Sequence, residues 1–163
     1  MSRMGEYEIC VSRERPNLGH RNAAALIKKA AALALSAEGV EKALISVMLT
    51  DDEGIRRVNR EFRGVDRATD VLSFPLNELT PGAFDPDDCD TDPETGAALL
   101  GDMMISLPRC RAQGEELGHG FDREIAYLTV HSVLHLLGYD HVDEGEMKKQ
   151  MRDREKTIMG DKD

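Results

Sequence analysis

The most constraining feature of this sequence is a segment near its C-terminal end that is apolar on nearly every side of a helix. Residues 122–138 carry Ile, Ala, Leu and Val almost all round the helical wheel, and a helix of this kind is buried at the centre of a fold. Two histidines, His131 and His135, stand in it at the i, i+4 spacing that places both imidazoles on one face. The other elements must therefore pack around a central helix that carries two histidines on one face.

A third histidine follows the predicted end of this helix. Gly138 accepts the left-handed backbone that a helix C-cap needs, so the chain is expected to reverse there and return His141 toward the first two histidines. Three convergent imidazole nitrogens with one open position form the ligand set of a catalytic zinc site. The spacing therefore predicts one Zn²⁺ per chain, bound by His131, His135 and His141.

The same spacing occurs in zinc peptidases of the metzincin type, which are a different class of enzyme. In those enzymes a glutamate directly after the first histidine is the general base. This chain has Ser132 at that position, and a serine hydroxyl takes up no proton near neutral pH without a base of its own. A zinc-dependent peptidase of metzincin-like geometry is therefore an alternative that lacks its usual carboxylate.

Outside the central helix the sequence predicts alternating strands and helices. Strands are expected at residues 7–12, 43–50, 70–74 and 99–106, and further helices at 21–37, 51–62, 108–117 and 143–159. Pro75 is expected to stop the third strand, and Asp143 with Glu146 has the spacing of a capping box. This order predicts an α+β or α/β fold: a small mixed, mostly parallel sheet of about four strands, flanked by helices around the zinc-binding helix.

Length and composition bear on domain number and compartment. A chain of 163 residues suits one core rather than two, so residues 1–163 are expected to form a single metal-dependent hydrolase domain. The sequence has no apolar run of membrane-spanning length and no apolar region typical of a secretory signal. Its three cysteines are far apart, which argues against a disulfide framework. These features predict a cytoplasmic protein that does not contact a membrane.

Acidic residues gather in one segment. Residues 76–98 contain seven carboxylates and no basic residue, and so carry −7 of the formal charge of −10. The segment is rich in Pro, Gly and Thr and shows no periodicity, which predicts a solvated, mobile loop. The net negative charge argues against broad nucleic-acid binding, because phosphate contacts need Lys and Arg.

Four arginines recur at intervals of four, three and four residues in and after the helix predicted at 51–62. They are Arg56, Arg60, Arg63 and Arg67. A guanidinium fork suits phosphate recognition, and one beside the zinc would stabilise charge that develops on a phosphate. The alternative is a solvated face paired with acids, since residues 51–70 hold five bases and six acids. Composition alone does not decide between the two.

Two acids are candidate hydrogen-bond partners of the metal ligands. Glu124 precedes His131 by seven residues on the same helix face, and it either accepts from an imidazole N–H or is a solvated acid of the first helical turn. Asp140 either orients a ligand histidine or is an ordinary turn residue.

Four stretches of the chain resemble the YbeY family of bacterial metal-dependent endoribonucleases. They are VNREFRGVDRATDVLSFP (58–75), LGDMMIS (100–106), REIAYLTVHSVLHLLGYDH (123–141) and the Glu- and Met-containing C-terminal helix. The third stretch resembles the family pattern HGxLHLxGYDH, except that Ser132 replaces a glycine. That serine either tightens the packing of the helix or touches substrate.

The resemblance implies zinc on the three histidines and single-strand-selective cleavage of RNA. It implies a role in ribosomal RNA maturation, notably at the 3′ end of the small-subunit RNA, and in ribosome quality control. The family's arginine falls on Arg63, which would be the catalytic phosphate clamp, while Arg56, Arg60 and Arg67 are candidate RNA-binding residues. Implied partners are ribosomal RNA, the small ribosomal subunit, an Era-type GTPase and a small-subunit ribosomal protein.

A ribosome-associated binding protein with a structural zinc is the remaining alternative. A structural site is closed by a fourth protein ligand, whereas a catalytic site keeps one position open. No further Cys or His stands near the three histidines in the sequence, which favours the open site.

Overall fold

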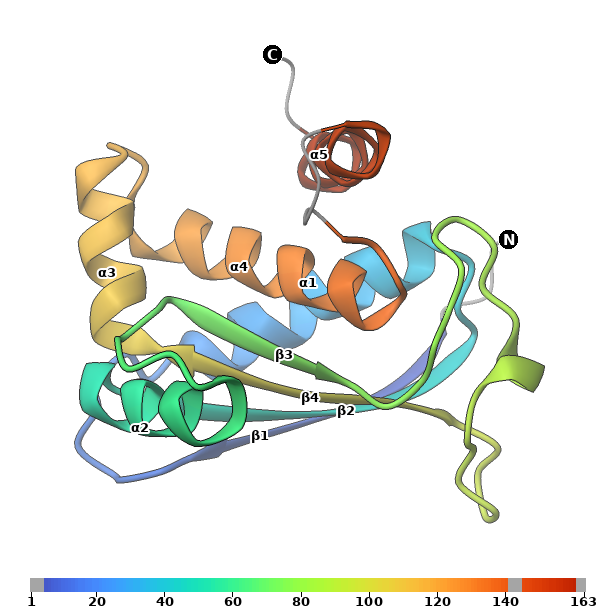
Figure 1. The fold of residues 1–163 in the computed structure, drawn as a ribbon, viewed down its shortest axis with the longest axis horizontal. Helices are drawn as coiled ribbons and strands as arrows, with labels where there is room; N and C mark the ends of the chain where they lie inside the picture. The colour runs from blue at the N-terminus through green and yellow to red at the C-terminus, as the bar shows by residue number, and fades with distance from the viewer. Residues whose placement is uncertain (1–4, 141–144, 161–163) are drawn as a thin grey trace.

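The computed structural model describes residues 5–140 and 145–160, and its central feature is one mixed sheet (Figure 1). The strands are β1 (Glu6–Arg13), β2 (Lys42–Thr50), β3 (Val71–Pro75) and β4 (Ala98–Ser106), arranged in the order β1-β2-β4-β3. β1, β2 and β4 are parallel, and β3 pairs with β4 in the antiparallel sense at one edge. The prediction of a small mixed, mostly parallel sheet is confirmed.

Five α-helices surround this sheet in the described ranges. They are α1 (Ala23–Ala37), α2 (Asp52–Arg63), α3 (Leu107–Glu116), α4 (Gly120–Leu136) and α5 (Glu146–Met159). α1 and α4 cover one face, α5 packs outside them, and α2 lies on the other side of β3 (Figure 1). The alternation of β3 side chains agrees with this arrangement, because Ser73 bonds to Ser132 of α4 while Phe74 packs against Phe62 of α2.

α4 is the buried central helix that the sequence predicted. It contacts α1, α3, α5, β3 and β4. Its apolar side chains Ile125, Val133 and Leu134 are fully buried in the core that the sheet and α1 complete. A buried polar group on this helix therefore needs a partner inside the fold or an opening toward a cavity.

Most predicted element ends differ from the structure by one or two residues, and three of the differences are informative. Pro75 lies inside β3 rather than after it, paired with Gly101; an edge strand tolerates a residue without an N–H, since one side of the strand needs no ladder partner. α4 ends at Leu136 rather than Gly138. The last helix begins at Glu146, and the predicted capping residue Asp143 lies outside the described residues.

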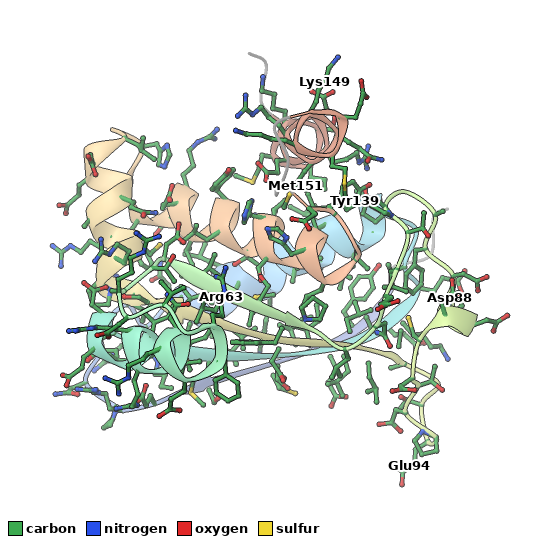
Figure 2. All side chains as sticks on the ribbon, in the orientation of Figure 1. Arg63, Asp88, Glu94, Tyr139, Lys149 and Met151 are labelled. Atoms are coloured by element: carbon green, nitrogen blue, oxygen red, sulfur yellow. The ribbon has the colours of Figure 1, made fainter. Side chains whose placement is uncertain are left out.

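The acidic segment connects β3 to β4 and is folded into hydrogen-bonded turns. Asp85 caps the short 3₁₀ helix η1 (Pro86–Asp88), and the Asn77 side chain donates to Leu99 O at 2.8 Å. Asp88 and Glu94 lie on the part that projects from the sheet, far from Arg63 (Figure 2). Asp88 and Glu94 are thus held away from Arg63, whereas Glu78 at the start of the loop lines the cavity described below. The predicted mobility of the loop stays a prediction.

The described helices and cysteines bear on the expected compartment. None of the helices in residues 5–140 and 145–160 is long and apolar enough to span a membrane. Cys10, Cys89 and Cys110 are free thiols, as the sequence predicted.

Candidate active site

Two imidazoles of α4 converge on one point. Nε2 of His131 and Nε2 of His135 lie 3.2 Å apart, and their rings meet edge to face with centroids 4.7 Å apart. Both side chains are partly exposed, although the three residues between them, Ser132, Val133 and Leu134, are buried. The i, i+4 spacing therefore brings two nitrogen atoms to one cavity, as predicted.

His131 is held from α5. Its Nδ1 lies 2.6 Å from Oε1 of Glu155, a carboxylate that is 7% exposed and also accepts from the Tyr127 hydroxyl at 3.0 Å. Because a carboxylate accepts hydrogen bonds, Nδ1 carries the hydrogen, and Nε2 presents its lone pair to His135. The sequence prediction missed Glu155. A signal for it exists, since Met147, Met151 and Glu155 recur every four residues and a carboxylate on an apolar stripe needs a buried partner.

His135 is held by the turn that ends α4. Gly138 N–H donates to His135 O and Tyr139 N–H donates to Leu134 O, which together make a Schellman motif. Gly138 has φ 103°, and a Cβ there would collide with the Leu79 carbonyl oxygen. The turn carries the Tyr139 carbonyl back to 3.0 Å from Nδ1 of His135. Since a carbonyl only accepts, Nδ1 again bears the hydrogen and Nε2 the lone pair.

The donor set suits a cation between the two rings. Two imidazole lone pairs 3.2 Å apart repel each other unless positive charge lies between them. Nitrogens bound to one tetrahedral zinc at about 2.0–2.1 Å lie about 3.3 Å apart, which matches the spacing here. His141, the predicted third ligand, lies outside the described residues. Within residues 5–140 and 145–160 no group of three potential metal ligands converges.

The two imidazoles share a cavity with the predicted arginine clamp. The cavity has a volume of about 690 Å³. Its lining includes His131, His135, Arg63, Asp70, Tyr139 and Asp140. Arg63 reaches it from the last turn of α2, and Tyr139 lies beneath α5 (Figure 2). Three segments far apart in the chain thus meet at one place. Asp140 is among the lining residues, and its two alternative roles, orienting a ligand histidine or forming the turn, stay predictions.

The other predicted arginines do not line this cavity with Arg63. Nε of Arg56 bonds to Oδ1 of Asp66 at 2.9 Å, so the alternative of a solvated, acid-paired face holds for Arg56. Arg67 lies with Arg56 at a separate hollow beside Asp52 and Asp66. Arg60 is exposed on α2. The four regularly spaced arginines therefore do not line one cavity.

Glu124 binds an imidazole, but not one of the predicted ligands. It is 2% exposed, its Oε1 lies 2.7 Å from Nε2 of His119, and it accepts from Gln113 at 3.0 Å. The alternative of a solvated acid is therefore wrong, and so is a direct contact with His131. Gln113 also donates to Asp70 at 3.1 Å, so this buried cluster reaches the lining of the cavity. Burial, with Glu124 and Asp70 nearby, raises the pKa of Cys110 to about 12.

Ser132 packs the central helix against the edge strand. It is fully buried, and its Oγ lies 2.6 Å from Oγ of Ser73 on β3. Of the two roles open to this serine, the structure favours helix packing over substrate contact. The position that carries the general base in zinc peptidases is therefore occupied here by a buried hydroxyl.

A mixed sheet with a central helix that presents two imidazoles to a cavity, beside an arginine, defines a hydrolase-type site for an anionic substrate. The comparison with known families agrees with this class. The family model described as Endoribonuclease YbeY matches residues 8–162. The chain belongs to the YbeY family of endoribonucleases, which are nuclease hydrolases.

Individual relatives support the same family. An Endoribonuclease YbeY of Desulfitobacterium hafniense is 49% identical, over 80% of this chain and 78% of the relative. One of Thermoanaerobacter sp. is 40% identical over 93% of this chain and 94% of its own length. A Thermotoga maritima protein solved in solution has a TM-score of 0.57 at 23% identity and covers 93% of this chain and 89% of its own. This last likeness supports the fold alone.

Proposed function

We propose that this chain is a zinc-dependent, single-strand-selective endoribonuclease that acts in ribosomal RNA maturation, at the 3′ end of the small-subunit RNA, and in ribosome quality control. The observation that carries the proposal is the convergence of His131 and His135 at 3.2 Å in a cavity that Arg63 also lines. Family membership supports RNA cleavage. The zinc, the ribosomal substrate and the association with the small subunit go beyond family membership and belong to the proposal.

The zinc would be held by His131, His135 and His141. The chemistry it supplies when bound is Lewis-acid activation of a phosphate oxygen or of water. Glu155 and the Tyr139 carbonyl keep the two described imidazoles in the tautomer that exposes Nε2. Partners of this kind orient ligand rings and raise ligand basicity, so the protein prepares the nitrogen pair before a cation arrives.

Arg63 would bind the scissile phosphodiester. Its guanidinium offers parallel N–H donors that match two phosphate oxygens. The cavity volume of about 690 Å³ is in the range of small-molecule sites, which suits one or two nucleotides rather than a duplex. Donors fixed beside the phosphate stabilise the charge that grows on it during cleavage.

The cavity also holds carboxylates that are candidates for moving protons. Asp70, Glu78 and Asp140 all line it. The product ends would identify the nucleophile, because attack by the ribose 2′-hydroxyl leaves a 2′,3′-cyclic phosphate and attack by water does not. Analysis of cleaved oligonucleotide ends therefore separates these two routes.

The test combines metal analysis of the purified protein with a 3′-end assay on small-subunit ribosomal RNA precursor. Wild type should contain about one zinc per chain and process the RNA; His135→Ala should lose zinc and activity, and Arg63→Ala should lose activity and keep zinc. Arg111→Ala is the matched control, since Arg111 is an exposed arginine of α3 paired with Glu115. Zinc well below one per chain, or unchanged processing in both variants, would overturn the proposal.

The same preparations test the two alternative functions. Cleavage of casein by wild type, lost in His135→Ala, would support the peptidase. Intact RNA processing in cells that carry a folded His135→Ala protein would support a binding protein with a structural zinc. The buried position of Ser132 argues against the peptidase, because no carboxylate stands where its general base would be.

A further inference from the structure

An aromatic ring lies exposed beside the arginine of the site. Phe62 is 71% exposed, the highest value among the large apolar side chains that the structure describes as exposed. It directly precedes Arg63, whose side chain lines the cavity. A single exposed apolar residue needs no explanation by itself, so the case for a role depends on where this ring lies and what holds it.

The ring of Phe62 is supported from one side by the edge strand. Its centroid lies 5.9 Å from that of Phe74, with an angle of 67° between the planes, an arrangement that aromatic pairs favour. The chain neighbours of Phe74 are Ser73 and Pro75, and both line the cavity. Phe62 therefore lies on the side of β3 that faces α2, one residue before Arg63 in the last turn of α2, where Phe74 supports it and solvent reaches it.

We infer that Phe62 is a stacking platform for an unpaired base of single-stranded RNA whose phosphate is held at Arg63. Aromatic side chains bind single strands in this way, because every base has a π-face that is free only when the base is unstacked. A platform next to the phosphate clamp gives the site a physical means of selecting single strands. This inference rests on the proposed function and adds a subsite to it.

Charge favours RNA over a protein partner as the occupant. Arg60 and Arg63 are exposed residues of the same last turn of α2 as Phe62. Positive side chains beside an aromatic face are the usual surface for a phosphate backbone with splayed bases. The acidic part of the loop after β3, marked by Asp88 and Glu94, projects away from Arg63 (Figure 2).

The chain offers a direct optical test, because it contains no tryptophan. Phe62→Trp places a single indole at the platform and retains an aromatic face. Zinc-loaded Phe62→Trp is titrated with short single-stranded oligoadenylate and with the same sequence in a duplex, and the RNA is checked for cleavage after each titration. We expect strong quenching of the indole by the single strand and little by the duplex. Quenching that is equal for both, or absent while the RNA binds, would overturn the inference.

Affinity measurements separate stacking from apolar contact. Phe62→Ala and Phe62→Leu should each weaken binding of the single strand roughly tenfold or more, while Phe62→Trp should bind as wild type. Leu33→Ala is the control, since Leu33 is a 52% exposed residue of α1, a helix that contributes no residue described as lining the cavity. An abasic nucleotide at the stacked position should remove the difference between wild type and Phe62→Ala.

The outcomes distinguish this inference from the proposed function. Wild type that binds no single-stranded RNA would overturn both. Wild type that binds and cleaves RNA while Phe62→Ala binds equally well would overturn the platform and leave the nuclease intact. A Phe62→Ala protein with normal RNA affinity that no longer associates with small ribosomal subunits would identify Phe62 as a protein contact and would likewise overturn the platform.

Discussion

Glu155 Oε1 lies 2.6 Å from Nδ1 of His131, so a residue of the last helix orients an imidazole of the central one. Its neighbour Arg154 bonds to Glu38 at the end of α1, and Glu38 accepts from the hydroxyl of Tyr139. The carbonyl of Tyr139 in turn orients His135. Two adjacent residues of α5 thus support the two imidazoles by separate routes. α5 therefore supports the site, although none of its residues is described as lining the cavity.

The first prediction concerns Glu155. Glu155→Gln should lower zinc affinity about 10- to 100-fold, because a neutral amide holds the His131 N–H less strongly and leaves the ring less basic. Competition with a chromogenic chelator measures this change directly. Glu146→Gln, an exposed acid in the first turn of the same helix, should leave affinity unchanged. Equal affinity in wild type and Glu155→Gln would show that the contact with His131 does not prepare the site.

The second prediction concerns the turn after α4. Gly138→Ala combines a positive φ with a collision at the Leu79 carbonyl, so it should cost about 2 kcal/mol or more and lower Tm by roughly 4–8 °C. Gly96→Ala is the matched control, since Gly96 has φ 76° and open space where the added methyl group would lie. This change should lower the free energy of unfolding by about 1 kcal/mol. Thermal unfolding followed by circular dichroism tests both. Equal losses would mean that the close approach of Leu79 does not constrain this turn.

Some of this site could be predicted from the sequence because it is encoded locally. The i, i+4 spacing places His131 and His135 on one helix face, and Gly138 ends that helix, whatever the rest of the fold does. Arg63 was placed by resemblance rather than by spacing. Spacing left Arg56 open between RNA contact and an acid-paired face, and in the structure Asp66 pairs with it from beyond the end of α2. Spacing along a helix predicts a shared face, but not what the face contacts.

Contacts between distant segments could not be predicted in this way. Glu155 lies 24 residues after His131. The two residues are partners only because α5 packs on α4. Helical geometry made Glu124 a candidate partner of the ligand histidines. In the structure the loop before α4 brings His119 to it instead. Pro75 illustrates the same point for the sheet, because its position in β3 depends on that strand being an edge.

The third prediction separates charge from geometry at the phosphate clamp. Arg63→Lys keeps the positive charge but loses the paired donors, so kcat on a single-stranded RNA should fall about 10²- to 10³-fold. Arg111→Lys, the same change at an exposed arginine of α3 that pairs with Glu115, should alter kcat little. Single-turnover cleavage of a labelled oligonucleotide measures the rate. A fully active Arg63→Lys protein would mean that Arg63 acts through charge alone.

The fourth prediction uses the thiols as reporters of burial. Cys110 is fully buried and its pKa is raised to about 12, so at pH values near 8 almost none of it is the reactive thiolate. Cys10 is exposed and should react at once with a thiol reagent. Cys89, whose pKa is raised by burial and by neighbouring aspartates, should react more slowly. Cys110 should react only on unfolding; rapid labelling of all three thiols in native protein would contradict the packing of α3.

The fifth prediction concerns the serine that follows the first histidine. Ser132 is buried against Ser73 and is absent from the described lining of the cavity, so its role is to fix α4 on β3. Ser132→Ala removes one buried hydrogen bond and should cost about 1 kcal/mol, with zinc content and KM for RNA unchanged. Ser73→Ala should cost a similar amount, and the double variant less than the sum, because the two hydroxyls share one bond. Urea unfolding of the four proteins measures this coupling. A rise in KM without loss of stability would instead mean that Ser132 touches substrate.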